Sequence, residues 1–187
     1  MTRPPILVLV LAGAFLLLVT SLLIGSFSEP DFPPYPLGPS GDSLYTLDAS
    51  NGERWQRFHF ARQAVVDSGP WDVAFRRNHM ITAPEAGALD LGPERFDSVR
   101  DVPGDGYTQT LFGGGDTTNP AIGKWYSYSM LSHLLTTRNH VYAIRTSDGR
   151  FVKLQLVAYY CRDVGAACYT MRYKATRPRP ASSGARN

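Results

Sequence analysis

Near its start the chain has a largely apolar run, Ile6 to Phe27, that contains no charged side chain. Its length matches the roughly 20 residues that a helix needs to cross the hydrocarbon core of a bilayer. Arg3 precedes the run, and the acidic residues Glu29 and Asp31 follow it. The positive-inside rule therefore predicts a cytoplasmic N-terminus, with the bulk of the chain across the membrane. A long signal peptide that is removed from the mature protein is the alternative.

The apolar run is followed by a proline-rich stretch, residues 28–43, which is typical of an extended spacer. From Leu44 onward the apolar and polar positions alternate over short segments, which predicts β-strands. We expect strands at Leu44–Asp48 and Trp55–Phe60. Asn51-Gly52 lies between them and supplies the positive φ angles of a tight turn, so the pair is predicted to form a hairpin.

Residues 71–77, "WDVAFRR", alternate in the same way. One face of this predicted strand is apolar and is expected to enter the core, and it carries Trp71, Val73 and Phe75. The other face carries Asp72, Ala74 and Arg76. We expect Asp72 and the two arginines at the rim of the sheet, beside the irregular segments that follow.

Residues 82–124 are rich in glycine and proline and show no periodicity, which is typical of a functional or partner-binding loop. The next segment, residues 124–140, is predicted to start as a strand and to pass into a short helical turn at Met130–Leu135. Residues 141–160, "VYAIRTSDGRFVKLQLVAYY", carry the clearest pattern: two alternating runs around Ser147-Asp148-Gly149 predict a β-hairpin.

A last strand is predicted over residues 168–176, with Thr170, Arg172 and Lys174 on a solvated face. Cys161 and Cys168 flank the short loop before it. If the strands on either side pair, the two sulfurs come close enough to join, and on the oxidising side of a membrane we expect a structural disulfide.

These patterns predict a mainly β fold, with an antiparallel, sandwich-like domain behind a single transmembrane helix. The expected organisation is an anchor at 1–27, a linker at 28–43, the β domain at 44–176 and a disordered tail at 177–187.

Composition and sequence motifs reduce the number of functional classes that fit this chain. The formal net charge is only +3 and the basic residues form no dense stripe, which is too mild to argue for a nucleic-acid partner, so none is expected. The glycine-rich segment before Lys124 fails the phosphate-loop pattern, because Trp125 stands where Ser or Thr is needed. No hydrolase signature occurs. We therefore expect a non-enzymatic protein.

Three segments in this order resemble the HmuY-like family, whose best-known members are bacterial haem-binding proteins. They are "WDVAFRR", "GKWYSYS", and the 141–160 hairpin with its closing "YTMRYKA". The resemblance covers most of residues 44–175 and implies a mostly antiparallel β fold that holds haem between two axial His or Met side chains. Characterised members are secreted or are anchored through a lipid-bearing Cys, whereas no Cys lies directly after the apolar run here.

Haem iron is usually ligated by His or Met in an apolar setting. The candidate axial ligands are His79 or Met80 on one side and His133 or His140 on the other. Arg76 and Arg77 are candidates to contact the propionates. The alternative is that the histidines are ordinary surface or capping residues and that the arginines form surface ion pairs.

Two functions follow. One is a haem-binding module that is anchored in the bacterial inner membrane, with its β domain in the periplasm and residues 6–27 in the lipid bilayer. The other is an accessory subunit of an inner-membrane respiratory or photosynthetic assembly, with integral membrane proteins as partners and the β domain covering the periplasmic face.

Overall fold

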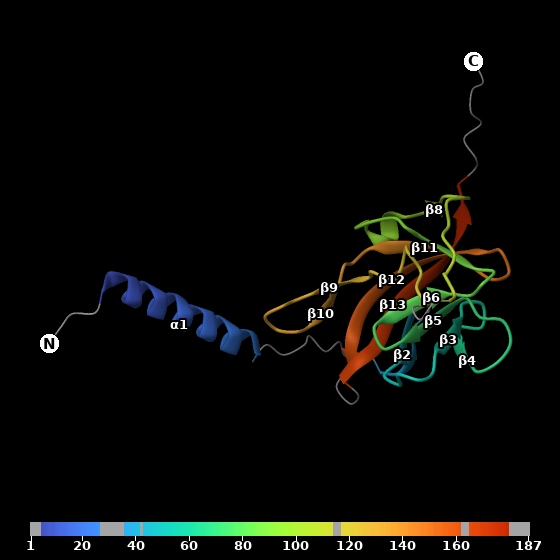
Figure 1. Ribbon diagram of the computed structural model, residues 1–187. Coiled ribbons are helices and arrows are strands. Elements are labelled where there is room, and N and C mark those ends of the chain that lie inside the picture. The colour runs from blue at the N-terminus through green and yellow to red at the C-terminus, as the bar shows by residue number, and fades with distance from the viewer. Residues whose placement is uncertain (1–4, 27–35, 42, 114–116, 162–164, 180–187) are drawn as a thin grey trace, which may run out of the picture.

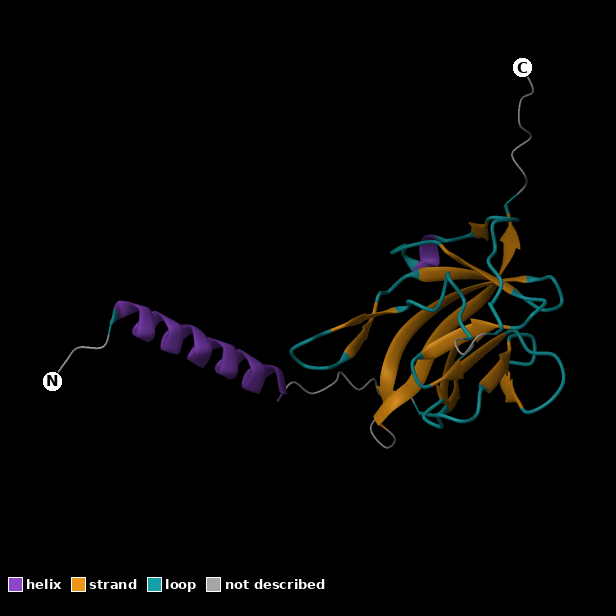
Figure 2. Ribbon diagram, in the orientation of Figure 1, coloured by secondary structure: helices purple, strands orange, loops and turns teal. Residues whose placement is uncertain are grey.

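The structure is a computed structural model, and it describes residues 5–26, 36–41, 43–113, 117–161 and 165–179. One α-helix precedes a β domain (Figures 1 and 2). In chain order the elements are α1 (Ile6–Ser26), β1 (Gly38–Ser40), β2 (Leu44–Asp48), β3 (Gln56–His59), β4 (Ala64–Val66), β5 (Val73–Arg76), β6 (His79–Thr82), β7 (Gly87–Asp90), the 3-10 helix η1 (Phe96–Ser98), β8 (Asp101–Val102), β9 (Tyr126–Tyr128), β10 (Leu135–Thr137), β11 (Val141–Arg145), β12 (Phe151–Cys161) and β13 (Gly165–Pro178).

The helix α1 is apolar on every side. Its segment Ile6–Ile24 has a mean hydropathy of 2.9 and is not buried against the rest of the protein. Within the described ranges it is the one helix that is long and apolar enough to cross a membrane. A helix with no polar face is unfavourable in water. It is expected either to lie in an apolar environment such as a bilayer or to be cleaved from the mature protein.

Two sheets form the body of the domain. The larger has seven strands in the order β1-β2-β13-β12-β11-β7, with β8 pairing in parallel with the end of β13. The smaller has the order β4-β3-β5-β6. All other ladders are antiparallel, so the predicted mainly β, antiparallel fold behind an N-terminal apolar helix is confirmed.

Aromatic rings fill the space between the sheets. Phe58 of β3 lies 4.8 Å from Tyr45 and 5.6 Å from Tyr173, measured between ring centroids. Phe75 of β5 lies 4.7 Å from Tyr169 of β13, which in turn contacts Trp125. Edge-on and tilted contacts of this kind add to the burial of apolar area. They fix the small sheet on one face of the large one.

The strand β5 is buried on both faces, whereas the sequence predicted one face in the core and the other at the rim of the sheet. Val73 and Phe75 enter the core as expected, but Ala74 is also fully buried and Asp72 is only 1% exposed. The reason is that loops cover the second face of the small sheet, where Thr110 Oγ1 accepts a hydrogen bond from the backbone N–H of Thr82 in β6 at 2.8 Å.

The predicted hairpin around Asn51-Gly52 is wrong. β2 pairs with β1 and β13 in the large sheet, whereas β3 pairs with β4 and β5 in the small one. Asn51 still makes a turn, because its Oδ1 accepts the N–H groups of Glu53 and Arg54. The turn carries the chain from one sheet to the other, a choice that short-range turn chemistry does not encode.

The predicted hairpin over residues 141–160 is formed by β11 and β12, with Gly149 at a positive φ of 82° in its turn. The helical turn expected at Met130–Leu135 is wrong: the chain turns back there and β9 pairs with β10 in an antiparallel hairpin. The solvated face expected on β13 is also only partly present, since Thr170 is fully buried and bonds Thr46 across the ladder.

The ends of the domain differ from the expected boundaries. β1 lies inside the stretch predicted as a linker, where it pairs with β2. β13 continues past residue 176, because Arg177 and Pro178 pair with β8. Residues 28–35 and 180–187 lie outside the described residues. Cys168 is fully buried, but the side chain of Cys161 lies outside the described part, so the disulfide stays a prediction.

The buried tyrosines predict how stability depends on alkaline pH. Burial raises the pKa of Tyr159 and of Tyr107 from 10.0 to about 12, and it also raises the pKa of Tyr169. Above pH 10 the unfolded chain releases protons that the folded chain retains. The free energy of unfolding should therefore be unaffected by these groups below pH 10 and should fall as the pH rises from 10 to about 12.

Urea denaturation at a series of alkaline pH values measures this effect, with tyrosinate absorbance following the phenols directly. Tyr159→Phe removes one ionisable group and should flatten the dependence. Normal titration of all tyrosines in the folded protein, without loss of stability, would contradict the prediction.

Candidate functional site

The β9–β10 hairpin is fixed to the body of the domain at its base and projects away from it (Figure 1). Trp125, just before β9, is 1% exposed, and its Nε1–H donates to the carbonyl of Asn78 at 3.0 Å. The Nδ2 of Asn78 donates to the hydroxyl of Tyr126 at 3.0 Å. On the other strand, the N–H of Leu135 donates to the hydroxyl of Tyr160 at 2.9 Å. The base is therefore held from two directions.

The tip of this hairpin is a defined turn. The N–H of His133 donates to the carbonyl of Ser129 at 2.9 Å, and His133 has a left-handed φ of 56°. Tyr128 lies beside His133, with the two ring centroids 5.9 Å apart and the tyrosine hydroxyl hydrogen-bonded to Nδ1. This contact occupies Nδ1 and leaves Nε2 as the ring nitrogen of His133 that can bind a ligand.

The turn between β5 and β6 carries three of the predicted residues. Arg76 ends β5, with its guanidinium 4.5 Å from the centre of the Trp55 ring. Arg77 is exposed and donates from Nη1 to the carbonyl of Ser50 at 3.1 Å. His79, which pairs with Arg76 at the start of β6, is exposed.

Asn78 brings this turn against the base of the β9–β10 hairpin. It sits between Arg77 and His79, and it bonds both Trp125 and Tyr126. The structure thus joins the elements that carry His79 and His133. Sequence reasoning missed Asn78. The available signal was an asparagine between two alternating runs, which favours a turn but does not identify its partner.

Met80 and His140 have other surroundings. Met80 is 1% exposed and belongs to the hydrophobic core between the sheets. His140 precedes β11, and its Nδ1 lies 2.9 Å from both carboxylate oxygens of Asp90. A carboxylate on one ring nitrogen orients the other toward a ligand, as in many metal-binding histidines. Asp90 lies 50 positions earlier in the chain, so no local pattern could have paired them.

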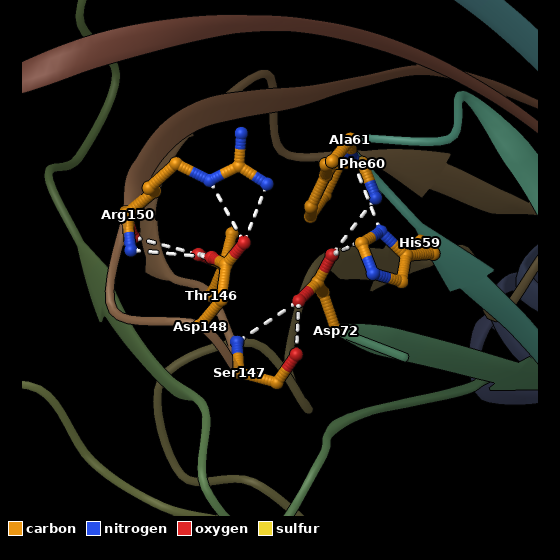
Figure 3. A network of polar contacts seen from close by, with 8 residues as sticks. All are labelled: His59, Phe60, Ala61, Asp72, Thr146, Ser147, Asp148 and Arg150. Atoms are coloured by element: carbon orange, nitrogen blue, oxygen red, sulfur yellow. Dashed lines mark hydrogen bonds and ion pairs between the residues drawn. The ribbon is translucent and has the colours of Figure 1, made fainter. Parts of the chain in front are cut away.

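Asp72, His59 and Ser147 also meet in space, as Figure 3 shows. The Oδ1 of Asp72 accepts the N–H and the hydroxyl of Ser147, each at 2.9 Å, and Oδ2 accepts the N–H of Phe60 at 2.8 Å. His59 Nδ1 lies 3.6 Å from Oδ2 and accepts the N–H of Ala61. The Ser147 hydroxyl thus bonds the carboxylate and not the imidazole. A hydrolytic triad needs the reverse arrangement, with the base on the hydroxyl.

A cavity of about 580 Å³ adjoins this network. Its lining residues come from the end of β3 and from three loops, and they are His59, Gly69, Pro70, Trp71, Pro84, Glu85, Ser147 and Asp148. None of the predicted haem ligands or arginines lines it. The described residues also contain no group of three or more His, Cys, Asp or Glu side chains that could hold a metal ion directly.

Comparison with solved structures identifies the fold. The chain is similar to an apo HmuY analogue from Tannerella forsythia, with 14% identity, a TM-score of 0.60, and coverage of 73% of this chain and 95% of that one. It is similar to a candidate HmuY-like haem-binding protein from Bacteroides vulgatus, with 19% identity, a TM-score of 0.59, and coverage of 70% and 89%. A candidate lipoprotein from Bacteroides fragilis matches with 16% identity, a TM-score of 0.60, and coverage of 70% and 86%.

The β domain therefore has the HmuY-like fold, and the resemblance read from the three sequence segments is confirmed at that level. No protein-family model matches the chain, and no curated protein does so. At these identities the likeness establishes the architecture, while the ligand has to be argued from the side chains.

The buried carboxylate of Asp72 predicts a large effect on stability. Asp72→Ala removes the acceptor of three hydrogen bonds and leaves the buried N–H of Phe60 and the half-buried N–H of Ser147 without partners. We expect a loss of roughly 3 kcal/mol in the free energy of unfolding. Asp148→Asn is the matched control, because Asp148 is an exposed carboxylate in the adjacent turn whose pair with Arg150 should contribute less than about 1 kcal/mol. Equal losses in chemical denaturation would contradict this role.

Proposed function

We propose that this protein is a non-enzymatic haem-binding module, tethered by α1 to the bacterial inner membrane with its β domain in the periplasm. The observation that carries the proposal is the HmuY-like fold combined with solvent-accessible imidazoles on the β9–β10 hairpin and on the adjacent β5–β6 turn. One structure of that fold is described as a candidate haem-binding protein. The apolar helix and its flanking charges support the tether.

His79 and His133 are the axial pair that the contacts favour. Both side chains are exposed, and Asn78 joins the elements that carry them. Tyr126 and Tyr128 occupy alternate positions of β9, so they lie on one face of the hairpin and offer aromatic surface to a flat ligand. His140 is the alternative to His133, because Asp90 orients its ring.

The remaining candidates have secondary roles in this proposal. Arg76 and Arg77 flank the same turn and would meet the negatively charged propionates. Met80 would have to leave the core to reach an iron atom, which makes it the least favoured ligand. Bound haem would supply an iron centre of redox and ligand-binding chemistry, and the protein would hold it through these imidazoles.

Haem titration of the full-length protein in mild detergent tests the proposal. We expect a Soret band that His79→Ala and His133→Ala each weaken strongly, because each removes an axial nitrogen. Met80→Leu should leave the spectrum unchanged, and Met171→Leu is its control, since both replace a buried core methionine with a side chain of similar volume.

A colourless protein that refuses added haem would contradict this function. If that protein also comigrates with a large membrane complex in native gels, the accessory-subunit function is the better account, with integral membrane proteins covering the domain.

We further propose that Cys161 and Cys168 form a disulfide, as expected for a periplasmic domain. Alkylation of unreduced protein from its native host, followed by mass spectrometry, should find neither thiol modified. Replacing both cysteines with serine should cost about 2–3 kcal/mol of unfolding free energy in the chain-entropy description. Two alkylated thiols would contradict both the bridge and the proposed compartment.

A further inference from the structure

The tip of the β9–β10 hairpin exposes large apolar side chains. Met130 is 73% exposed and Leu131 is 51% exposed, and Tyr128 next to them is 48% exposed. The N–H of Ser129 donates to the carbonyl of Leu134 and the carbonyl of Ser129 accepts from the N–H of His133, and these two hydrogen bonds order the turn that presents them. A folded turn that holds two aliphatic side chains outward offers a specific apolar contact.

The hairpin also lacks charge. Residues 125–137, "WYSYSMLSHLLTT", contain no Asp, Glu, Lys or Arg, although 19% of the chain is charged. Lys124 and Arg138 bracket this run at the base, where Arg138 Nη1 donates to the carbonyl of Lys124 at 3.2 Å. From tip to base, the hairpin presents apolar side chains, then tyrosine and serine, then cations. This order suits a hairpin whose tip enters the apolar part of the interface while its cations lie near anionic lipid headgroups.

The strand register places this hairpin at the end of the large sheet where the chain arrives from α1. β1 enters at Gly38, which pairs with Thr46, and the chain before it continues toward Asp48. Asp48 pairs with Cys168, near the β12–β13 turn. Tyr160 lies at that same turn, and its hydroxyl holds β10. Residues 27–37 join α1 to β1 and can span at most about 40 Å, which keeps this end of the domain near the membrane.

We propose that the tip of the β9–β10 hairpin inserts Met130 and Leu131 into the interfacial layer of the bilayer that α1 crosses. This inference rests on the anchoring of α1 under the proposed function. The contact fixes the orientation of the domain, so that the end of the large sheet with the β12–β13 turn faces the lipid. The hairpin then has two contact surfaces. Its tip contacts lipid through Met130 and Leu131, and the face with Tyr126 and Tyr128 contacts a ligand.

The full-length protein in nanodiscs of mixed neutral and anionic lipid provides the test. An environment-sensitive fluorophore is attached through Met130→Cys, without reduction of the native cysteines. We expect blue-shifted emission that is quenched by nitroxide groups on the lipids. Leu131→Glu in the same labelled protein should abolish both signals, because a charge resists entry into the interface.

Two further labels separate the possible failures. Leu16→Cys reports whether α1 is in the bilayer, and Ala61→Cys labels an exposed position at the opposite end of the domain and should remain in water. Quenching at position 16 without quenching at 130 overturns the hairpin contact and leaves the anchor intact. No quenching at position 16 overturns the anchor itself.

Other occupants of the tip give distinct results. If the blue shift at position 130 requires two copies in one nanodisc, a second molecule covers the tip and the lipid contact is wrong. Haem titration of Leu131→Glu keeps the two functions apart: an unchanged Soret band with lost quenching supports Leu131 as a lipid contact that takes no part in haem binding.

Discussion

The domain depends on one buried carboxylate that ties its two sheets together. Asp72 immediately precedes β5 of the small sheet, and its two oxygens accept hydrogen bonds from Phe60, just after β3 of the same sheet, and from Ser147 in the β11–β12 turn of the large one. A charge with 1% of its surface exposed is costly unless donors surround it, and these donors have to be in place for the fold to form. The relative position of the sheets is thereby specified more closely than by apolar contact alone.

Contacts between aromatic rings of the core connect the two packed sheets to the candidate site. Tyr169 of β13 lies between Phe75 of the small sheet and Trp125 at the root of the β9–β10 hairpin. Trp125 in turn bonds the carbonyl of Asn78 in the β5–β6 turn. The elements that carry His79 and His133 are therefore both tied to the same rings. A site built on such supports needs little rearrangement to receive a rigid, flat ligand.

The hairpin and the apolar helix together would set the orientation of the domain relative to the membrane under the proposed function. The entry strand β1 and the hairpin lie at the end of the large sheet with the β12–β13 turn, while the β11–β12 turn and the end of β13 lie at the other. A single flexible attachment limits how far a domain lies from the membrane but leaves it free to rotate. A second point of attachment removes that freedom. In the proposed orientation, the turn with Arg76, Arg77 and His79 would be held at a set height above the lipid.

The sequence by itself determined the apolar helix, the antiparallel β class, the strand at Leu44–Asp48 and the hairpin over residues 141–160. Each follows from periodicity or turn chemistry within a few residues. It misjudged Asp72, the Asn51-Gly52 connection and the segment at Met130–Leu135. Whether a strand has one buried face or two, and which sheet a strand joins after a turn, depends on segments far away in the chain. The candidate residues could likewise be named from their chemistry, but only the tertiary structure sent Met80 into the core, paired His140 with Asp90, and set His79 beside the hairpin of His133. Those outcomes rest on long-range contacts, whose free energy is gained only when the sheets pack together.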